Sequence, residues 1–259
     1  MSIMRKLILV IFAVWIVPIV LVAFAQDAVP TEILDRTILI KVGNVQGTAF
    51  SVDYLGKLYL ITARHVAAGL PEVKATIQVW QSEQWKDYQT VRTLFPSSSA
   101  VDIAVFETTE NVSQPFKVSS TSGAQTMGQQ VWFLGYPWEI ASRFSNGARA
   151  PFIKRGTMSA VDATNPDAVI IYIDGFNNPG FSGGPVVYWD FKKQAYGLLG
   201  VVKGYKFDTA KAVINGAQVD TQILVNSGIL VAYSIDHAMK AIEESQKQSR
   251  PALGSGGKK

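Results

Sequence analysis

The sequence predicts an all-β protein made of two similar β units and closed by a C-terminal helix. Short runs of β-branched and aromatic residues, about six before residue 111 and about six after residue 125, are separated by polar turn residues. Strands this short and closely spaced favour sandwiches or barrels over βαβ units. The segment between the two groups, residues 111–125, is rich in Ser and Thr and has the composition of a linker. With 259 residues, 48% of them hydrophobic, the chain can bury a sizeable core.

Each unit is expected to contain short strands that pair as hairpins. Gly43-Asn44 and residues 53–56 are turn residues that join the first three runs. The expected strands of the first unit are residues 37–42, 47–52, 58–62, 75–80, 88–94 and 102–106. Those of the second unit are residues 130–134, 155–161, 168–173, 185–188, 195–203 and 229–233.

A helix is expected after the last strand, over residues 235–244. Ser234 or Asp236 can cap its start. The apolar residues that recur at helical spacing are Ile235, Ala238, Met239 and Ile242. Residues 245–259 are polar and rich in glycine, so we expect a disordered tail.

The N-terminus has the pattern of an export signal. Arg5 and Lys6 precede an apolar run at residues 7–22, and Ala23-Phe24-Ala25 follows. Positive charges, an apolar stretch and an A-x-A motif in this order predict a secretory signal peptide cleaved before Gln26, and a secreted or periplasmic protein. The alternative is an uncleaved membrane anchor, since the apolar run and the A-x-A motif together are 19 residues long.

Composition excludes several kinds of site. The chain has no cysteine and two histidines, so it has no disulfide, no thiol nucleophile and no cluster of Cys or His ligands for a metal. We expect no metal and no cofactor. The net charge is +4, and the basic residues are scattered, so a nucleic-acid partner is not expected either.

A glycine-rich segment, residues 178–185, presents a candidate nucleophile. It reads Asn-Pro-Gly-Phe-Ser-Gly-Gly-Pro, and its glycines permit a tight turn that exposes the hydroxyl of Ser182. The backbone N–H groups of Gly180 and Ser182 can then converge on one point, as an oxyanion hole requires. The alternative is an ordinary loop of Gly, Ser and Pro.

Two further segments supply a candidate base and its partner. His65 lies on the turn after a hydrophobic strand, and a serine hydrolase needs a histidine as base. The other histidine, His237, is expected on an exposed helix flank. Asp102 opens an otherwise apolar strand, where a buried carboxylate needs a hydrogen-bond donor such as an imidazole N–H. Taken singly, His65 would be interpreted as a structural histidine, and Asp102 could instead be a turn residue that caps the start of the strand.

Together these segments resemble the trypsin-like (chymotrypsin-fold) serine peptidases. Residues 62–66 (Thr-Ala-Arg-His-Val) resemble the family's histidine motif, and residues 102–105 (Asp-Ile-Ala-Val) its aspartate motif. Residues 179–185 resemble its serine motif, with Phe181 where Asp or Asn is usual. The order His, Asp, Ser also fits. Further segments that fit the family are residues 47–50, 135–137 and 154–160, the last two resembling the cysteine-free bacterial HtrA/Deg branch, here without its PDZ domain.

The resemblance implies two packed six-stranded antiparallel β-barrels, at about residues 33–110 and 126–233, with the active site between them. It implies that Ser182 attacks a peptide carbonyl, that His65 takes and returns the proton, and that Asp102 holds the imidazole. The amides of Gly180 and Ser182 would bind the oxyanion, and an acyl-enzyme would follow. The implied function is a serine endopeptidase acting on proteins or peptides.

The substrate pocket is also expected from this resemblance. Its base would be Phe176, six residues before Ser182, with Asp174 as the alternative if the alignment slips. The residues expected in its walls are Val201, Val202, Lys203, Gly204, Leu230, Val231 and Ala232. These are largely apolar, which favours small or medium apolar residues at the cleaved position.

Two other functions stay open from the sequence. The first is a non-catalytic peptide-binding module or pseudoprotease on the same fold, because Phe181 beside the serine is unusual for the family. The second is an esterase, because residues 180–184 also satisfy G-x-S-x-G. A helix should follow the serine in an esterase, whereas residues 185–189 are expected to form a strand.

Overall fold

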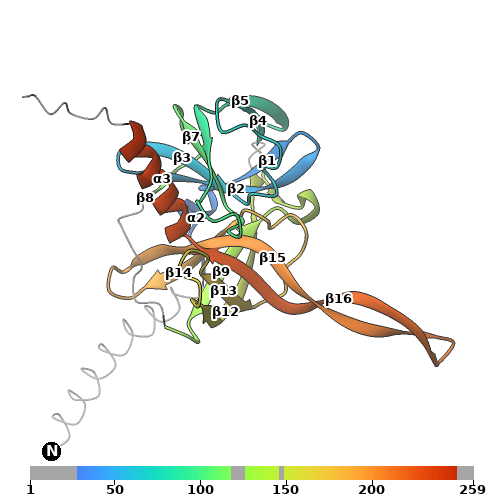
Figure 1. Cartoon of the computed structure of the whole chain (residues 1–259). Coiled ribbons are helices and arrows are strands. Elements are labelled where there is room, and N and C mark those ends of the chain that lie inside the picture. The colour runs from blue at the N-terminus through green and yellow to red at the C-terminus, as the bar shows by residue number, and fades with distance from the viewer. Residues whose placement is uncertain (1–27, 118–125, 146–148, 250–259) are drawn as a thin grey trace, which may run out of the picture.

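The computed structural model describes residues 28–117, 126–145 and 149–249, and shows two β units with a long helix, α3, beside the first (Figure 1). The all-β class with a C-terminal helix is confirmed. The predicted signal peptide and residues 250–259 of the predicted tail lie outside the described residues. Within the described ranges, no helix combines the length and apolar character that crossing a bilayer demands.

The first unit is an eight-stranded sheet. Its strands are ordered β5-β4-β1-β2-β3-β7-β6, and β8 pairs with β2. All of these pairs are antiparallel except β2 with β8. The elements are α2 (Thr31–Leu34), β1 (Thr37–Val42), β2 (Val45–Tyr54), β3 (Lys57–Thr62), β4 (Thr76–Gln81), β5 (Gln84–Gln89), β6 (Arg92–Leu94), β7 (Ala104–Thr108) and β8 (Phe116–Lys117).

The first unit thus has more strands than the six expected. The run at 88–94 is divided between the end of β5 and β6, and β8 falls in the segment expected to be a linker. β5 folds back on β4 through Ser82 and Glu83, whose φ angles are 51° and 63°. Neither residue is a glycine, so the composition gave no sign of this left-handed turn.

The second unit is a closed six-stranded barrel, as expected, with the order β12-β13-β16-β15-β14-β9. Every neighbouring pair is antiparallel. The elements are β9 (Gln130–Gly135), η1 (Pro137–Glu139), β10 (Ser142–Arg143), β11 (Arg149–Ala150), β12 (Phe152–Asp162), β13 (Ile170–Asp174), β14 (Pro185–Asp190), β15 (Ala195–Ile214) and β16 (Ala217–Ser234).

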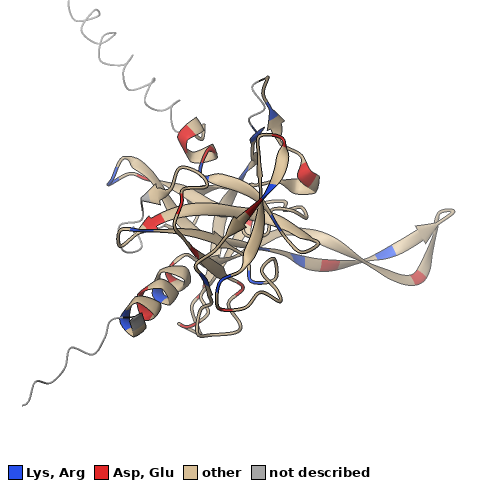
Figure 2. Ribbon diagram, turned by 90° about the horizontal axis from the view of Figure 1, so that it is seen from above, with Lys and Arg blue, Asp and Glu red and all other residues tan. Residues whose placement is uncertain are grey.

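β15 and β16 extend far beyond the barrel as a two-stranded ribbon, residues 206–228, which we call the arm (Figure 1). At its tip, Asn215 and Gly216 have φ angles of 50° and 81°, the left-handed pair that a two-residue hairpin loop requires. Acidic and basic residues are interspersed along it (Figure 2). Its exposed large apolar residues are Phe207, Val213, Ile214, Ile223 and Leu224.

One of the hydrophobic cores joins both units and α3 (Asp236–Ser249). It includes Phe50 from β2, Leu134 from β9 and Ile242 from α3, each fully buried. The Tyr54 hydroxyl of β2 donates to Glu243 Oε1 of α3 at 2.5 Å. The helix therefore follows the second unit in the chain but also packs against the first.

α3 ends at Ser249, five residues beyond the expected end at residue 244. Residues 245–249, which were expected to belong to a disordered tail, are therefore helical. Ser245 is buried, and Gln246 Nε2 donates to the Tyr59 hydroxyl at 3.1 Å. The expectation of an exposed His237 is wrong, because its side chain is buried and its Nε2 accepts the backbone N–H of Val169 at 2.8 Å.

Candidate active site

The pairing of β3 with β7 brings His65 and Asp102 together. Thr62, the last residue of β3, is opposite Ala104, the first residue of β7. His65 lies just after β3 and Asp102 just before β7. The two side chains therefore meet at one edge of the sheet, with His65 Nδ1 at 2.6 Å from Asp102 Oδ2. The His65 backbone N–H also donates to Asp102 Oδ1 at 2.9 Å.

The Asp102 carboxylate is held in its ionised form. Burial by itself raises the pKa of this carboxyl, but the hydrogen bonds and charge of His65, with the nearby charge of Lys203, outweigh burial and leave the pKa below its ordinary value. An ionised carboxylate can only accept a hydrogen bond, so His65 Nδ1 carries the proton. The other ring nitrogen, Nε2, is then free to accept a proton, and the His65 side chain is 48% exposed.

The turn that carries Ser182 depends on its glycines. Gly180 and Gly183 have φ angles of +103° and +83°, which favour glycine. A Cβ at Gly183 would overlap with Thr48 O and Thr62 Oγ1 and would lie 2.7 Å from Ala63 N. The turn is therefore pressed against the end of β3, two to three residues before His65.

Phe181 anchors this turn in the second barrel. Its side chain is fully buried, and its ring centroid lies 5.2 Å from that of Phe133. A Cβ at Gly135 would lie 2.7 Å from Phe181 Cδ1, so Gly135 makes room for the ring. The residue that departs from the usual serine motif is thus a core residue here.

Thr48 holds both sides of the serine turn. Its backbone N–H donates to Ser182 O at 2.9 Å, and its hydroxyl donates to Gly180 O at 2.7 Å. The same hydroxyl accepts the Tyr136 N–H at 3.1 Å. Residues 47–50 resemble a segment of the family, but the sequence alone indicates no role for Thr48. Thr48 and Gly180 are 132 positions apart in the sequence, so their contact depends on how the two units pack and cannot be read from a local motif.

The Ser182 hydroxyl is not hydrogen-bonded to His65 in the described structure. Ser182 Oγ donates instead to the carbonyl of Lys203, at 3.2 Å. The structure therefore pairs His65 with Asp102 and sets Ser182 beside β15. Among the described residues, the N–H groups of Gly180 and Ser182 have no acceptor, which leaves both available to a ligand.

A cavity of about 600 Å³ opens beside His65 and Asp102. Of the residues predicted to bind substrate, Lys203, Gly204 and Val231 line it. Val201 and Val202 do not line it, because both side chains are fully buried in the hydrophobic cores.

Phe176, the predicted pocket base, does not line this cavity. The Phe176 side chain is 55% exposed, and its carbonyl accepts a hydrogen bond from Lys154 Nζ at 2.7 Å. Asp174, the alternative, is exposed at the end of β13. Leu230 and Ala232 are fully buried and do not line the cavity, so most of the apolar residues expected in the pocket walls are absent from it.

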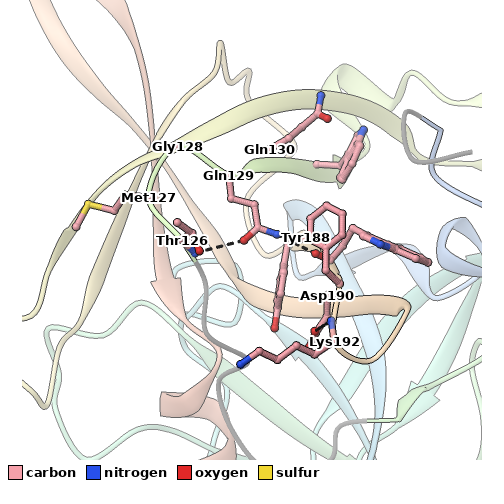
Figure 3. A pocket seen from close by; sticks show the side chains of 11 residues that line it. Thr126, Met127, Gly128, Gln129, Gln130, Tyr188, Asp190 and Lys192 are labelled. Carbon is pink, nitrogen blue, oxygen red and sulfur yellow. Dashed lines mark hydrogen bonds between the residues drawn. The ribbon is translucent and has the colours of Figure 1, made fainter. Parts of the chain in front are cut away.

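A larger cavity, of about 680 Å³, lies on the second barrel between the start of β9 and the end of β14 (Figure 3). Gln129 bridges it, accepting the Thr126 N–H at 3.4 Å and donating to Trp189 O at 2.8 Å (Figure 3). None of the predicted site residues lines this cavity.

The described residues match neither a metal site nor the nucleophile elbow of an esterase. Across residues 28–117, 126–145 and 149–249, no three His, Asp or Glu residues are grouped so that they could hold a metal ion. The residues after Ser182 form a turn and then β14, which begins at Pro185. An α/β-hydrolase nucleophile elbow would lead into a helix, so the esterase interpretation does not fit.

Comparison with known proteins supports the family expected from the motifs. The family model described as a trypsin-like peptidase domain matches residues 47–198. No curated protein sequence matches this chain.

Solved structures of several proteases have a fold similar to that of this chain. The HtrA-type protease AlgW, solved with a tripeptide, is 19% identical, with a TM-score of 0.54 over 84% of this chain and 62% of that chain. The active form of the Rv3671c protease from M. tuberculosis is 17% identical, with a TM-score of 0.52 over 82% of each chain. The serine endoprotease from Yersinia pestis is 16% identical, with a TM-score of 0.54 over 86% of this chain and 70% of that chain. At these identities the likeness shows the fold alone.

Proposed function

Because the chain belongs to the trypsin-like peptidase family, we propose that it is a serine endopeptidase and that His65, Asp102 and Ser182 form its catalytic triad. The observation that carries this proposal is the His65–Asp102 pair, with 2.6 Å between Nδ1 and Oδ2 and a second bond from the His65 backbone. This arrangement fixes the tautomer in which Nε2 is the base.

In the proposed mechanism, the Ser182 side chain rotates away from the Lys203 carbonyl and donates to His65 Nε2. The Ser182 oxygen attacks the peptide carbonyl carbon while its proton passes to His65. His65 then protonates the departing amine, which leaves an acyl-enzyme ester. A water molecule, deprotonated by His65, attacks the ester carbonyl carbon. The bond from that carbon to Ser182 Oγ then breaks, His65 returns the proton to Ser182 Oγ, and the acid product leaves. Asp102 stabilises the imidazolium in both steps.

The N–H groups of Gly180 and Ser182 are proposed to bind the oxyanion. Both amides are without an acceptor among the described residues, and Thr48 fixes the turn that carries them. Preorganised donors of this kind contribute a large part of the rate acceleration, because they need no rearrangement as charge develops on the oxygen.

A non-catalytic peptide-binding module is the second candidate. It is favoured by one observation, the hydrogen bond of Ser182 Oγ to Lys203 O in place of His65. A fluorophosphonate probe separates the two functions, because it reacts only with an activated serine. We expect wild-type protein to be labelled at Ser182 and the Ser182→Ala and His65→Ala variants to remain unlabelled. Absence of labelling in folded wild-type protein would support the binding module.

We also propose that the enzyme works outside the cytoplasm, secreted or in the periplasm. The support is the charged, apolar and A-x-A order of the first 25 residues. N-terminal sequencing of the exported protein should begin at Gln26. Full-length protein in the membrane fraction would indicate an anchor instead.

A further inference from the structure

The cavity beside His65 is lined by more positive than negative side chains. Arg64, Lys203 and Lys206 line it, and Asp102 is the carboxylate that faces them. Asp102 is already paired with His65. Neither Lys203 nor Lys206 forms an ion pair with a described residue.

The two lysines are positioned by aromatic rings and not by carboxylates. Lys203 Nζ lies 5.7 Å from the centroid of Tyr233, and Lys206 Nζ lies 5.6 Å from that of Tyr172. Contact of an ammonium with a ring face is weak at an exposed site, so both groups remain able to bind an anion. Arg64 differs, because its guanidinium already donates to Pro96 O at 2.9 Å.

The cavity also has room between the lysines. Gly204 lies between Lys203 and Tyr205, and a Cβ at Gly204 would meet no atom within 4 Å. A substrate side chain can enter there without displacing protein atoms.

A peptide bound at Ser182 would lie next to this cavity. Ser182 Oγ contacts the Lys203 carbonyl, and the pairing of β15 with β14 ends at Val201 opposite Pro185. From Lys203 outward, no strand among the described residues pairs with the edge of β15 that faces the serine, so an extended peptide can add to that edge. Side chains within a few positions of the reacting carbonyl can reach the cavity.

We propose that the cavity selects an acidic side chain, Asp or Glu, within four residues of the cleaved bond, and that Lys206 is a specificity-determining residue. The proposal rests on the proposed peptidase function. Two unpaired ammonium groups attract a carboxylate and repel a basic side chain.

The test uses fluorogenic peptides in which each of the four positions on either side of the cleaved bond is in turn Asp, Asn or Lys. At one position at least, we expect kcat/KM to be about tenfold higher for Asp than for Asn, the effect of one charge-assisted hydrogen bond. Lys at that position should be the poorest of the three. The preference should shrink as ionic strength rises, because the site is open to solvent.

Reversing the charge of Lys206 tests whether this residue determines the preference. The Lys206→Glu variant should lose the preference for Asp and accept Lys. The matched control is Lys211→Glu, on the exposed arm and outside the cavity, which should keep the wild-type preference. Equal kcat/KM for Asp and Asn at all positions, or an unchanged preference in Lys206→Glu, would overturn the proposal.

Binding to the Ser182→Ala variant separates this proposal from the peptidase function. Fluorescence anisotropy should show tighter binding of the Asp peptide than of the Asn peptide, without any cleavage. If wild-type protein cleaves peptides but Ser182→Ala binds both equally, the acidic preference is wrong and the peptidase function stands. If Asp peptides bind more tightly but wild-type protein cleaves none, the peptidase function is wrong.

Discussion

The hydroxyl of Thr48 offers a direct test of how the serine turn is held. In the Thr48→Val variant the shape of the side chain is kept, but Gly180 O loses its donor at 2.7 Å and the Tyr136 N–H loses its acceptor at 3.1 Å. Thr48 is fully buried, so water cannot replace either partner. Each unsatisfied buried group costs about 1–3 kcal/mol, and the added methyl returns part of this. We expect a net loss of about 2–4 kcal/mol in the free energy of unfolding.

Urea unfolding measures this loss, and the rate of fluorophosphonate labelling at Ser182 measures the effect on the site. Labelling should slow by about 10²-fold if the turn no longer presents both amides, the effect of losing one oxyanion donor. The matched control is Thr48→Ser, which keeps the hydroxyl and should restore both readouts almost fully. A Thr48→Val protein with wild-type stability and labelling rate would refute the role assigned to Thr48, as would a Thr48→Ser protein no better than Thr48→Val.

Three other predictions concern the triad, the acid stability and the arm. Ser182→Ala and His65→Ala should each lower kcat by a factor on the order of 10⁶. The double variant should lose little more activity, because the residues act as a unit. Asp102→Asn should lower kcat by about 10⁴. Additive losses in peptide-cleavage kinetics would argue against a shared mechanism. Burial lowers the pKa of His237 from its ordinary value of 6.5. Below pH 6.5 the unfolded chain therefore binds a proton at His237 more readily than the folded chain does, and the free energy of unfolding should decrease. Protonation of Nε2 would also remove the acceptor of the Val169 N–H. Urea unfolding at pH 7.5 and 5.5 measures this, and His237→Gln should show a smaller difference; an equal difference in both proteins would contradict the argument. Replacing residues 208–225 by Asn-Gly should change Tm by less than about 2 °C, because no side chain of this segment is buried; a large decrease in calorimetry would show that the arm stabilises the barrel.

The motifs predicted the pairing of His65 with Asp102 through the roles that the family resemblance implies, and the pairing of β3 with β7 supplies the geometry. The serine motif likewise predicted a turn that only glycine can form at Gly183. The turn depends on local backbone geometry, which a short sequence pattern can indicate, whereas the His65–Asp102 contact depends on strand pairing and was expected only from the resemblance.

The pocket residues depended on longer-range geometry and were predicted less well. Val201 and Val202 are on the predicted strand, but their side chains belong to two different hydrophobic cores, because both faces of β15 are covered at this point. Phe176 was placed by counting back from Ser182, and a count gives no information on which way a loop residue points. The arm was missed although Asn215-Gly216 is a strong hairpin signal, because the flanking residues are not clearly alternating.

The position of α3 has a consequence for when the enzyme becomes active during synthesis. The bond between Tyr54 and Glu243 joins residues 189 positions apart, and the shared core contains both Phe50 and Ile242. The sheet that carries His65 and Asp102 is made early, but the part of its apolar face that α3 covers stays exposed until α3 has been synthesised. Contacts of such long separation form slowly, since closing the loop costs entropy before any contact compensates for it. We therefore expect the peptidase to gain activity only after α3, at the end of the described residues, has been synthesised.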